Sequence, residues 1–184
     1  MNPPLYLFIT FLFISSPLAA QEPQICRQAK DWRAERSFGV RSDSTVIDVR
    51  AGLQWQRCAL GQRGPDCRGE PQRLSALQAR DQVFVINRQG LAGHKDWRLP
   101  TRAELETLVS PNCVRPAISL RSFPNTPAIP FWPHTEPGPE GHADNVDFES
   151  GFIGKDDRNL PNAVRLVRSI KPRKASAAKP ARSS

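Results

Sequence analysis

The chain has 184 residues, of which 26 are Lys or Arg and 18 are Asp or Glu, so its formal net charge is +8. Hydrophobic residues make up 39% of the sequence and charged residues 24%, which is typical of a soluble globular protein and excludes a multi-pass membrane protein. With 11 Gly and 18 Pro, the chain is too poor in these residues to be wholly disordered. The length predicts one domain of ordinary size, with room for tails.

The first segment, residues 1–20, has the pattern of a secretory signal peptide. It carries no charged side chain, and the run 5–14 is almost wholly apolar. Small residues and a proline follow, which predicts cleavage after Ala20. An apolar run of about ten residues is too short to cross a bilayer, which needs about 20. We therefore expect an exported protein, periplasmic or secreted, with no stable membrane insertion.

Four cysteines follow the expected cleavage site: Cys26, Cys58, Cys67 and Cys113. In an oxidising compartment they are expected to form two disulfides, for which three pairings are open. A flexible loop with glycines and a proline lies between Cys58 and Cys67, which favours a short bridge there and leaves Cys26 with Cys113. Loop-closure entropy assigns about 2.7 kcal/mol to the short bridge and about 4.6 kcal/mol to the long one. The spacings match no common zinc pattern.

The last segment, residues 171–184, contains five basic side chains and no acidic one. This composition predicts a basic disordered tail and places the folded domain at 24–170. Two interpretations of the tail remain open: a solubilising end, and a tether to an anionic glycan, an envelope polymer or lipid head groups. Nucleic acid is not an expected partner, because no nucleic-acid-binding motif is present.

Alternating residues predict a β-hairpin over 45–57. Gly52 is expected to take a positive φ at its turn, since the residues before and after it alternate as in strands. Leu53 and Trp55 are expected to point inward, and the two glutamines that alternate with them to point to water.

The first of two capping boxes, at Ser75 and Gln78, predicts a helix over 76–88 that ends at Gly90. A strand at 83–86 is the alternative, because that run is also apolar. The helix would present a wide apolar face made of Leu77, Ala79, Val83, Phe84 and Ile86.

The second box, at Thr101 and Glu104, predicts a helix that runs to about Val109. Near the C-terminus, 145–148 and 163–170 have the alternation of strands and are expected to pair as a hairpin. Helices and strands are not interleaved one by one, which favours an α+β domain with an antiparallel sheet over a doubly wound α/β fold.

These segments resemble the Lcl C-terminal domain-like family, formerly a domain of unknown function. The resemblance rests on an opening motif at 46–58, a central motif at 93–105 (Gly-His-Lys-Asp-Trp-Arg-Leu-Pro-Thr, then Glu-Leu) and a closing strand at 164–168 (Val-Arg-Leu-Val-Arg). It covers about 45–169 and implies a compact, loop-rich, C-type-lectin-like α+β domain with two short helices, distantly similar to formylglycine-generating enzymes. It also implies an exported bacterial protein, since the best-known member is an adhesin for sulfated polysaccharide.

The central motif is interpreted as structural. Trp97 is expected in the core, and Asp96 and Arg98 are expected to fix loops through charge-assisted hydrogen bonds. Thr101 and Glu104 belong to the same structural set as the helix cap. Two further arginines, Arg165 and Arg168, fall on opposite faces of a strand, so one of them is expected to be structural.

Binding is assigned to aromatic and basic side chains in polar surroundings. Trp32 and Trp132 would offer flat faces to a sugar or a partner loop, although both are also candidates for the core. Arg115 and Arg121 would bind sulfate or carboxylate groups.

No metal, cofactor or catalytic residue is predicted. A cluster of imidazole and carboxylate side chains is interpreted as a solvated loop rather than a metal site; it comprises His134, Glu136, Glu140, His142 and Asp144. A calcium site at Asn145 and Asp147 is suggested by the lectin-like analogy alone. Common hydrolase, phosphate-loop and metalloprotease motifs are missing from the sequence.

The function expected is a non-catalytic binding module for an anionic glycan or cell-envelope polymer. The alternative is a protein-interaction subunit of an envelope assembly, and a cryptic enzyme is a third hypothesis. The sequence leaves the oligomeric state open.

Overall fold

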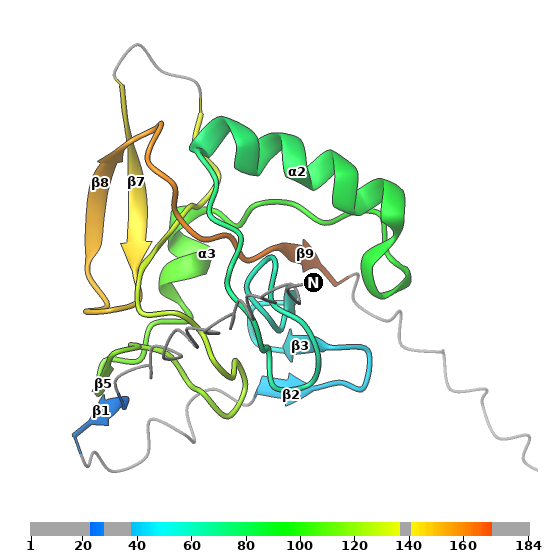
Figure 1. Cartoon of the computed structure of the whole chain (residues 1–184). Coiled ribbons are helices and arrows are strands. Elements are labelled where there is room, and N and C mark those ends of the chain that lie inside the picture. The colour runs from blue at the N-terminus through cyan, green and yellow to red at the C-terminus, as the bar shows by residue number, and fades with distance from the viewer. Residues whose placement is uncertain (1–22, 28–37, 137–140, 171–184) are drawn as a thin grey trace, which may run out of the picture.

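The computed structural model of the chain describes residues 23–27, 38–136 and 141–170. The predicted signal peptide (1–20), the predicted basic tail (171–184), Trp32 and Glu140 lie outside these residues. Figure 1 shows the described part as small sheets joined by long connections, with one longer helix, α2, along one side.

The strands form three antiparallel sheets. In the first, β1 (Ile25–Cys26) pairs with β5 (Cys113–Val114). The second has the order β2 (Phe38–Val40), β3 (Thr45–Asp48), β4 (Leu53–Gln56) and β9 (Val167–Ser169). The third has the order β6 (Pro130–Phe131), β7 (His142–Asp147) and β8 (Ile153–Asp157). With the helices α2 (Ala76–Gln89) and α3 (Arg102–Glu106) and the 3₁₀ turn η1 (Leu91–Gly93), the architecture is α+β, as predicted.

The predicted hairpin is formed by β3 and β4, and Gly52 has φ of 64° at its turn. The glutamines of β4, however, do not point to water. Gln54 is 3% exposed and bonds Thr45, and the side chain of Gln56 accepts a hydrogen bond from the Leu166 backbone. The prediction was wrong because side chains pack on both faces of β4, and all four of its residues are buried.

Helix α2 begins and ends where its capping signals predicted. The Ser75 hydroxyl accepts from the Gln78 amide, the Gln78 side chain accepts from the Ser75 amide, and Gly90 closes the helix with φ of 72°. Its predicted apolar face is only half correct. Ala79 and Ile86 are buried, whereas Leu77 and Phe84 are 60% and 67% exposed. Seven positions separate the exposed pair, so both lie on the outward side of the helix.

Helix α3 has the predicted Thr101–Glu104 box but ends at Glu106, before the predicted Val109. The backbone amides that follow the helix donate to carbonyls three residues back instead of four: Thr107 donates to Glu104, and Leu108 donates to Leu105. This tighter winding is common at helix ends and buries Leu105 and Leu108 within one turn.

The predicted pairing of 145–148 with 163–170 was wrong. Strand β7 instead forms its hairpin with β8, and Gly154 lies inside β8 opposite Asn145. The chain reverses early because the Asp147 carboxylate accepts hydrogen bonds from the residues after it. The segment 163–170 then crosses to the other sheet, where β9 pairs with β4.

Both predicted disulfides are present. Cys26–Cys113 joins segments that are distant in the sequence, and Cys58–Cys67 closes a local loop. Such bonds are characteristic of proteins in an oxidising or extracellular compartment. Among the described residues, none of the helices is both long enough and apolar enough to cross a membrane.

Candidate functional site

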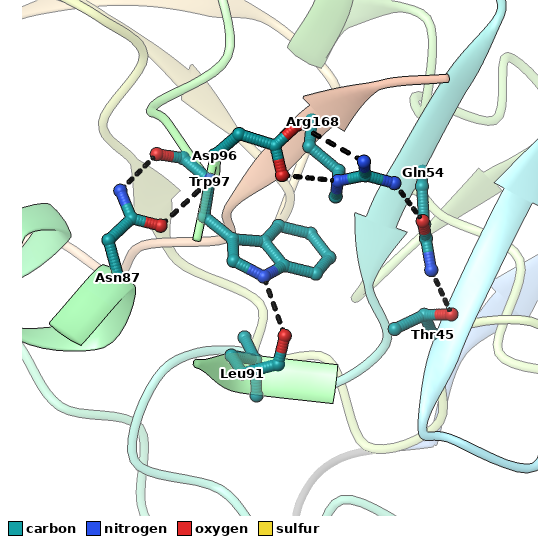
Figure 2. Close-up of polar contacts among 7 residues, drawn as sticks. All are labelled: Thr45, Gln54, Asn87, Leu91, Asp96, Trp97 and Arg168. Atoms are coloured by element: carbon teal, nitrogen blue, oxygen red, sulfur yellow. Dashed lines mark hydrogen bonds and ion pairs between the residues drawn. The ribbon is translucent and has the colours of Figure 1, made fainter. Parts of the chain in front are cut away.

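The central motif lies at a hydrogen-bonded junction between α2 and the four-stranded sheet (Figure 2). The indole of Trp97 is buried, and its Nε1 donates to the Leu91 carbonyl at 2.9 Å. The side chain of Asn87 on α2 holds the Trp97 backbone from both sides: Nδ2 donates to its carbonyl at 2.8 Å, and Oδ1 accepts from its amide at 2.9 Å. The loop that contains the motif is thereby fixed against the C-terminal part of α2.

The same motif is tied to the sheet through Asp96. Its carboxylate accepts from Arg168 on β9 at 2.7 and 3.1 Å, and Arg168 donates onward to Gln54, which bonds Thr45 (Figure 2). The hydrogen bonds from Arg168 lower the pKa of Asp96 below its ordinary value. These contacts join the loop to the sheet, and the sequence analysis had predicted a structural role for Asp96 and Trp97.

A bidentate ion pair completes the junction. Arg98 donates to both carboxylate oxygens of Glu104 at 2.7 Å, while Glu104 also accepts from the Thr101 amide at 2.8 Å. The hydrogen bonds from Arg98, with a smaller contribution from Thr101, lower the pKa of Glu104. The Arg98 backbone exchanges two hydrogen bonds with Val167, so the motif also adjoins β9.

Replacing Glu104 by glutamine is expected to lower the free energy of unfolding by about 1 kcal/mol at neutral pH, because glutamine preserves the cap but loses the ion pair. A carboxyl with a lowered folded pKa stabilises the fold above its unfolded pKa, and this stability is lost as pH falls through the folded value. The difference between the two proteins should therefore shrink in acid. Urea unfolding at about pH 7 and about pH 3 tests this, with Glu70→Gln as the exposed control. An equal loss at both pH values would contradict it.

The sequence analysis did not identify Arg165 as a buried cation. Its side chain has no exposed surface, and burial lowers its pKa to about 9. The guanidinium donates to the carbonyls of Gln56 and Arg57 and, at 2.7 Å, to the Thr126 hydroxyl. The rings of Phe123 and Phe131 lie beside it, with centroids 4.6 and 5.8 Å from the guanidinium carbon. Arg165 and Arg168 are thus both structural, where only one was expected.

Of the predicted binding residues that the structure describes, one lies in the core and two lie on the surface. Trp132 is fully buried, and its Nε1 donates to the Leu74 carbonyl at 2.8 Å, so the ligand-face interpretation was wrong and the core alternative holds. Arg115 and Arg121 are both exposed. The Arg115 guanidinium lies 3.8 Å from the carboxylate of Glu149, which places it in a surface ion pair.

The imidazole and carboxylate cluster is held by pairwise contacts. His134 lies 2.9 Å from Glu136, and Asp144 accepts from Arg102 at 3.2 Å. Within the described ranges, no three His, Cys, Asp or Glu side chains are placed to hold a metal ion. At the calcium candidate, Asn145 is buried and the Asp147 carboxylate is engaged in the turn after β7.

The candidate site is an open groove beside the C-terminal part of α2, which we call the α2 groove. It has a volume of about 790 Å³ and is lined by Phe84, Asn87, Arg88 and Lys95. The Asn87–Trp97 contacts place Lys95 against the helix, because Lys95 is two residues before the clamped tryptophan. The methylene carbon next to its amine lies near Gly90, at the negative end of the helix dipole.

The groove combines one aromatic face with two cations. Phe84 is two-thirds exposed, and Arg88 lies one helical turn after it. No carboxylate is among its lining residues in the described part of the chain. The sequence analysis did not identify this groove, and it placed Phe84 on a wide apolar face of the helix. The signal was the spacing of Leu77, Phe84 and Arg88, which share one side of a helix.

The fold and the groove define a small, disulfide-linked α+β domain that presents an aromatic and basic surface. The family model of the Lcl C-terminal domain matches residues 44–168, so the chain belongs to this family, as the sequence motifs indicated. A search of curated proteins found no match.

Proposed function

We propose that this chain is an exported, non-catalytic binding module for an anionic glycan or another anionic polymer of the cell envelope, active in the periplasm or outside the cell. A C-type-lectin-like classification of the fold is part of the same proposal. The observation that carries it is the α2 groove, in which exposed Phe84 lies beside Arg88 and Lys95 with no lining carboxylate among the described residues.

The chemistry of the groove suits a charged sugar chain. An exposed phenyl ring offers an apolar face against which the C–H face of a sugar ring can pack. Guanidinium and ammonium groups bind the carboxylate or sulfate substituents of such a chain, the former with planar donor geometry and the latter as a point charge. An open groove also admits a polymer that continues beyond the site at both ends.

One observation favours the alternative function, a protein-interaction subunit of an envelope assembly. Leu77 and Phe84 together expose apolar surface along the outward side of α2. Exposed apolar surface of this kind is common where proteins contact one another. Both functions therefore involve the same helix but differ in their ligand, and one experiment separates them.

The test measures binding of the mature chain to heparin, polygalacturonate and neutral dextran by calorimetry at low and high salt. Arg88→Glu with Lys95→Glu is expected to weaken binding of the two anionic polymers at least about tenfold at low salt, since two attractive charges become repulsive. Phe84→Ser should weaken binding at both salt concentrations, because the packing of a sugar on the ring is not screened.

Arg63→Glu is the matched control, because Arg63 is an exposed arginine of the Cys58–Cys67 loop outside the groove. A second variant replaces the five basic residues of 171–184 by glutamine, which separates the tail from the groove. Unchanged binding in the Arg88→Glu, Lys95→Glu protein would overturn the glycan site. Absence of any polymer binding, together with a stable protein complex lost in Phe84→Ser, would establish the alternative.

A further inference from the structure

A second hollow lies at the other side of the molecule, between the β7–β8 hairpin, the start of α3 and the segment after β6. In Figure 1 the hairpin is well separated from the C-terminal end of α2. The hollow has a volume of about 240 Å³ and shares no residue with the α2 groove. Its walls carry Arg102, His134, Glu136, His142, Asp144, Lys155 and Arg158, and Pro133, Thr135 and Ala143 complete the lining.

Arg158 is a cation of the hollow that makes no ion pair with a carboxylate among the described residues. The Arg158 guanidinium donates to two backbone carbonyls, that of Glu136 at 2.7 Å and that of His142 at 3.1 Å. Its backbone amide donates to the Gly141 carbonyl at 2.9 Å. Carbonyl oxygens fix the orientation of a guanidinium but leave its full positive charge available, so Arg158 is a preorganised cation at this wall.

The Asp144 carboxylate of the hollow is paired with cationic side chains. Asp144 accepts from Arg102, whose guanidinium also pairs with Glu106 at 3.0 Å. Lys155 lies directly opposite Asp144 in the β7–β8 register. The described wall residues thus carry three permanent cations and two carboxylates, a net charge of one positive unit before any histidine is protonated.

Two of the three histidines of the chain line this hollow. His134 contacts Glu136, and His142 lies opposite Asp157 on β8. Protonation of both would raise the net charge of the wall residues to three positive units. A histidine that gains a proton gains a positive charge, so we expect the attraction of this hollow for an anion to increase on acidification.

We propose that this hollow is a pH-sensitive binding site for a tetrahedral oxyanion, the phosphate or sulfate group of a molecule about as large as a monosaccharide. Lysine, arginine and histidine residues line this space from several elements, and such side chains can supply donors to the distributed oxygens of a tetrahedral anion. The proposal does not depend on the function of the α2 groove, because no lining residue is common to the two.

Inorganic sulfate is the probe, because its charge does not change between about pH 5.5 and about pH 7.5, so a pH effect on its binding reports the protein's protonation. Sulfate is titrated into the full mature chain at constant ionic strength and followed through backbone amide NMR shifts. The amides of Asp144 and Lys155 are expected to shift, with binding about tenfold tighter at the lower pH.

The variants assign the effect to named groups. His134→Gln with His142→Gln should remove the pH dependence and leave the weaker binding seen at about pH 7.5. His94→Gln is the matched control, since the third histidine lies outside the hollow, and it should leave both affinities unchanged. Lys155→Gln should weaken binding about threefold at either pH, because it removes one permanent charge.

Absence of saturable shifts at these amides at both pH values would overturn the site, and pH dependence that survives in the double histidine variant would overturn its mechanism. Glucose 6-phosphate and glucose 6-sulfate, followed at the same amides, distinguish the two sources of the oxyanion. The Arg88→Glu, Lys95→Glu protein should bind sulfate in this hollow normally, so a failure of the glycan proposal is separable from a failure of this one.

Discussion

Replacing Arg165 by methionine is expected to lower the free energy of unfolding by about 3 kcal/mol. The guanidinium donates to the backbone carbonyls of Gln56 and Arg57 and to Thr126, and a methionine of similar length leaves all three acceptors without this donor. Burial lowers the pKa of Arg165 to about 9, which shows that desolvation opposes the charged form. The hydrogen bonds and the adjacent aromatic rings must outweigh that cost for the cation to remain inside.

Urea unfolding of Arg165→Met, Arg165→Lys and the exposed control Arg63→Met measures the effect. The lysine variant is expected to fall between wild type and methionine, because an ammonium keeps the charge but lacks the planar donor geometry. The control should stay within about 0.5 kcal/mol of wild type. A methionine variant as stable as the control would show that the desolvation of the charge cancels its hydrogen bonds.

Removing the Cys26–Cys113 disulfide by paired serine substitution is expected to cost up to about 4.6 kcal/mol, against about 2.7 kcal/mol for Cys58–Cys67. The two bridges span 87 and 9 positions, so the longer one restricts the unfolded chain more. Beyond the bridge, the backbone of β1 is held mainly by its short pairing with β5 and by the hydrogen bond from the Arg27 amide to the Asn112 carbonyl. We therefore also expect β1 to detach first in the Cys26→Ser, Cys113→Ser protein.

Denaturant unfolding compares the two paired-serine proteins, and hydrogen exchange at Val114 reports release of β1. Each protein is the control for the other, because each loses two cysteines and one disulfide. A larger loss for the short bridge, or full protection of Val114 without the long one, would contradict the prediction.

The elements that the sequence predicted well are those specified by neighbouring residues. Both capping boxes are contained within four positions, so the starts of α2 and α3 follow from local hydrogen bonds. The short disulfide follows from a flexible loop for the same reason. The partner of 163–170 depends instead on a choice between two sheets, and no local pattern distinguishes β4 from β7.

Burial was harder to predict than the starts of the helices, because it also depends on residues that are distant in the sequence. Gln54 has the alternation of an exposed strand residue, but β9 and Arg168 cover it from 114 positions away. Phe84 has the hydrophobicity of a core residue, yet only one side of α2 packs on the protein. The α2 groove depends on the Asn87–Trp97 clamp, which forms only when the loop after η1 folds back on the helix.

The connection between β9 and β4 also determines how the molecule would carry a mechanical load. Strand β9 ends at Ser169, and the amide of the next residue, Ile170, donates to the Gly52 carbonyl just before the segment 171–184 begins. A pulling force applied to the C-terminal end would therefore act first on the edge strand β9 and then, through its hydrogen bonds, on the inner strand β4. Arg168 on β9 is hydrogen-bonded to Asp96, the residue after Lys95, so part of such a force would reach the loop that carries Lys95. A load on the C-terminal end is therefore mechanically coupled to the α2 groove.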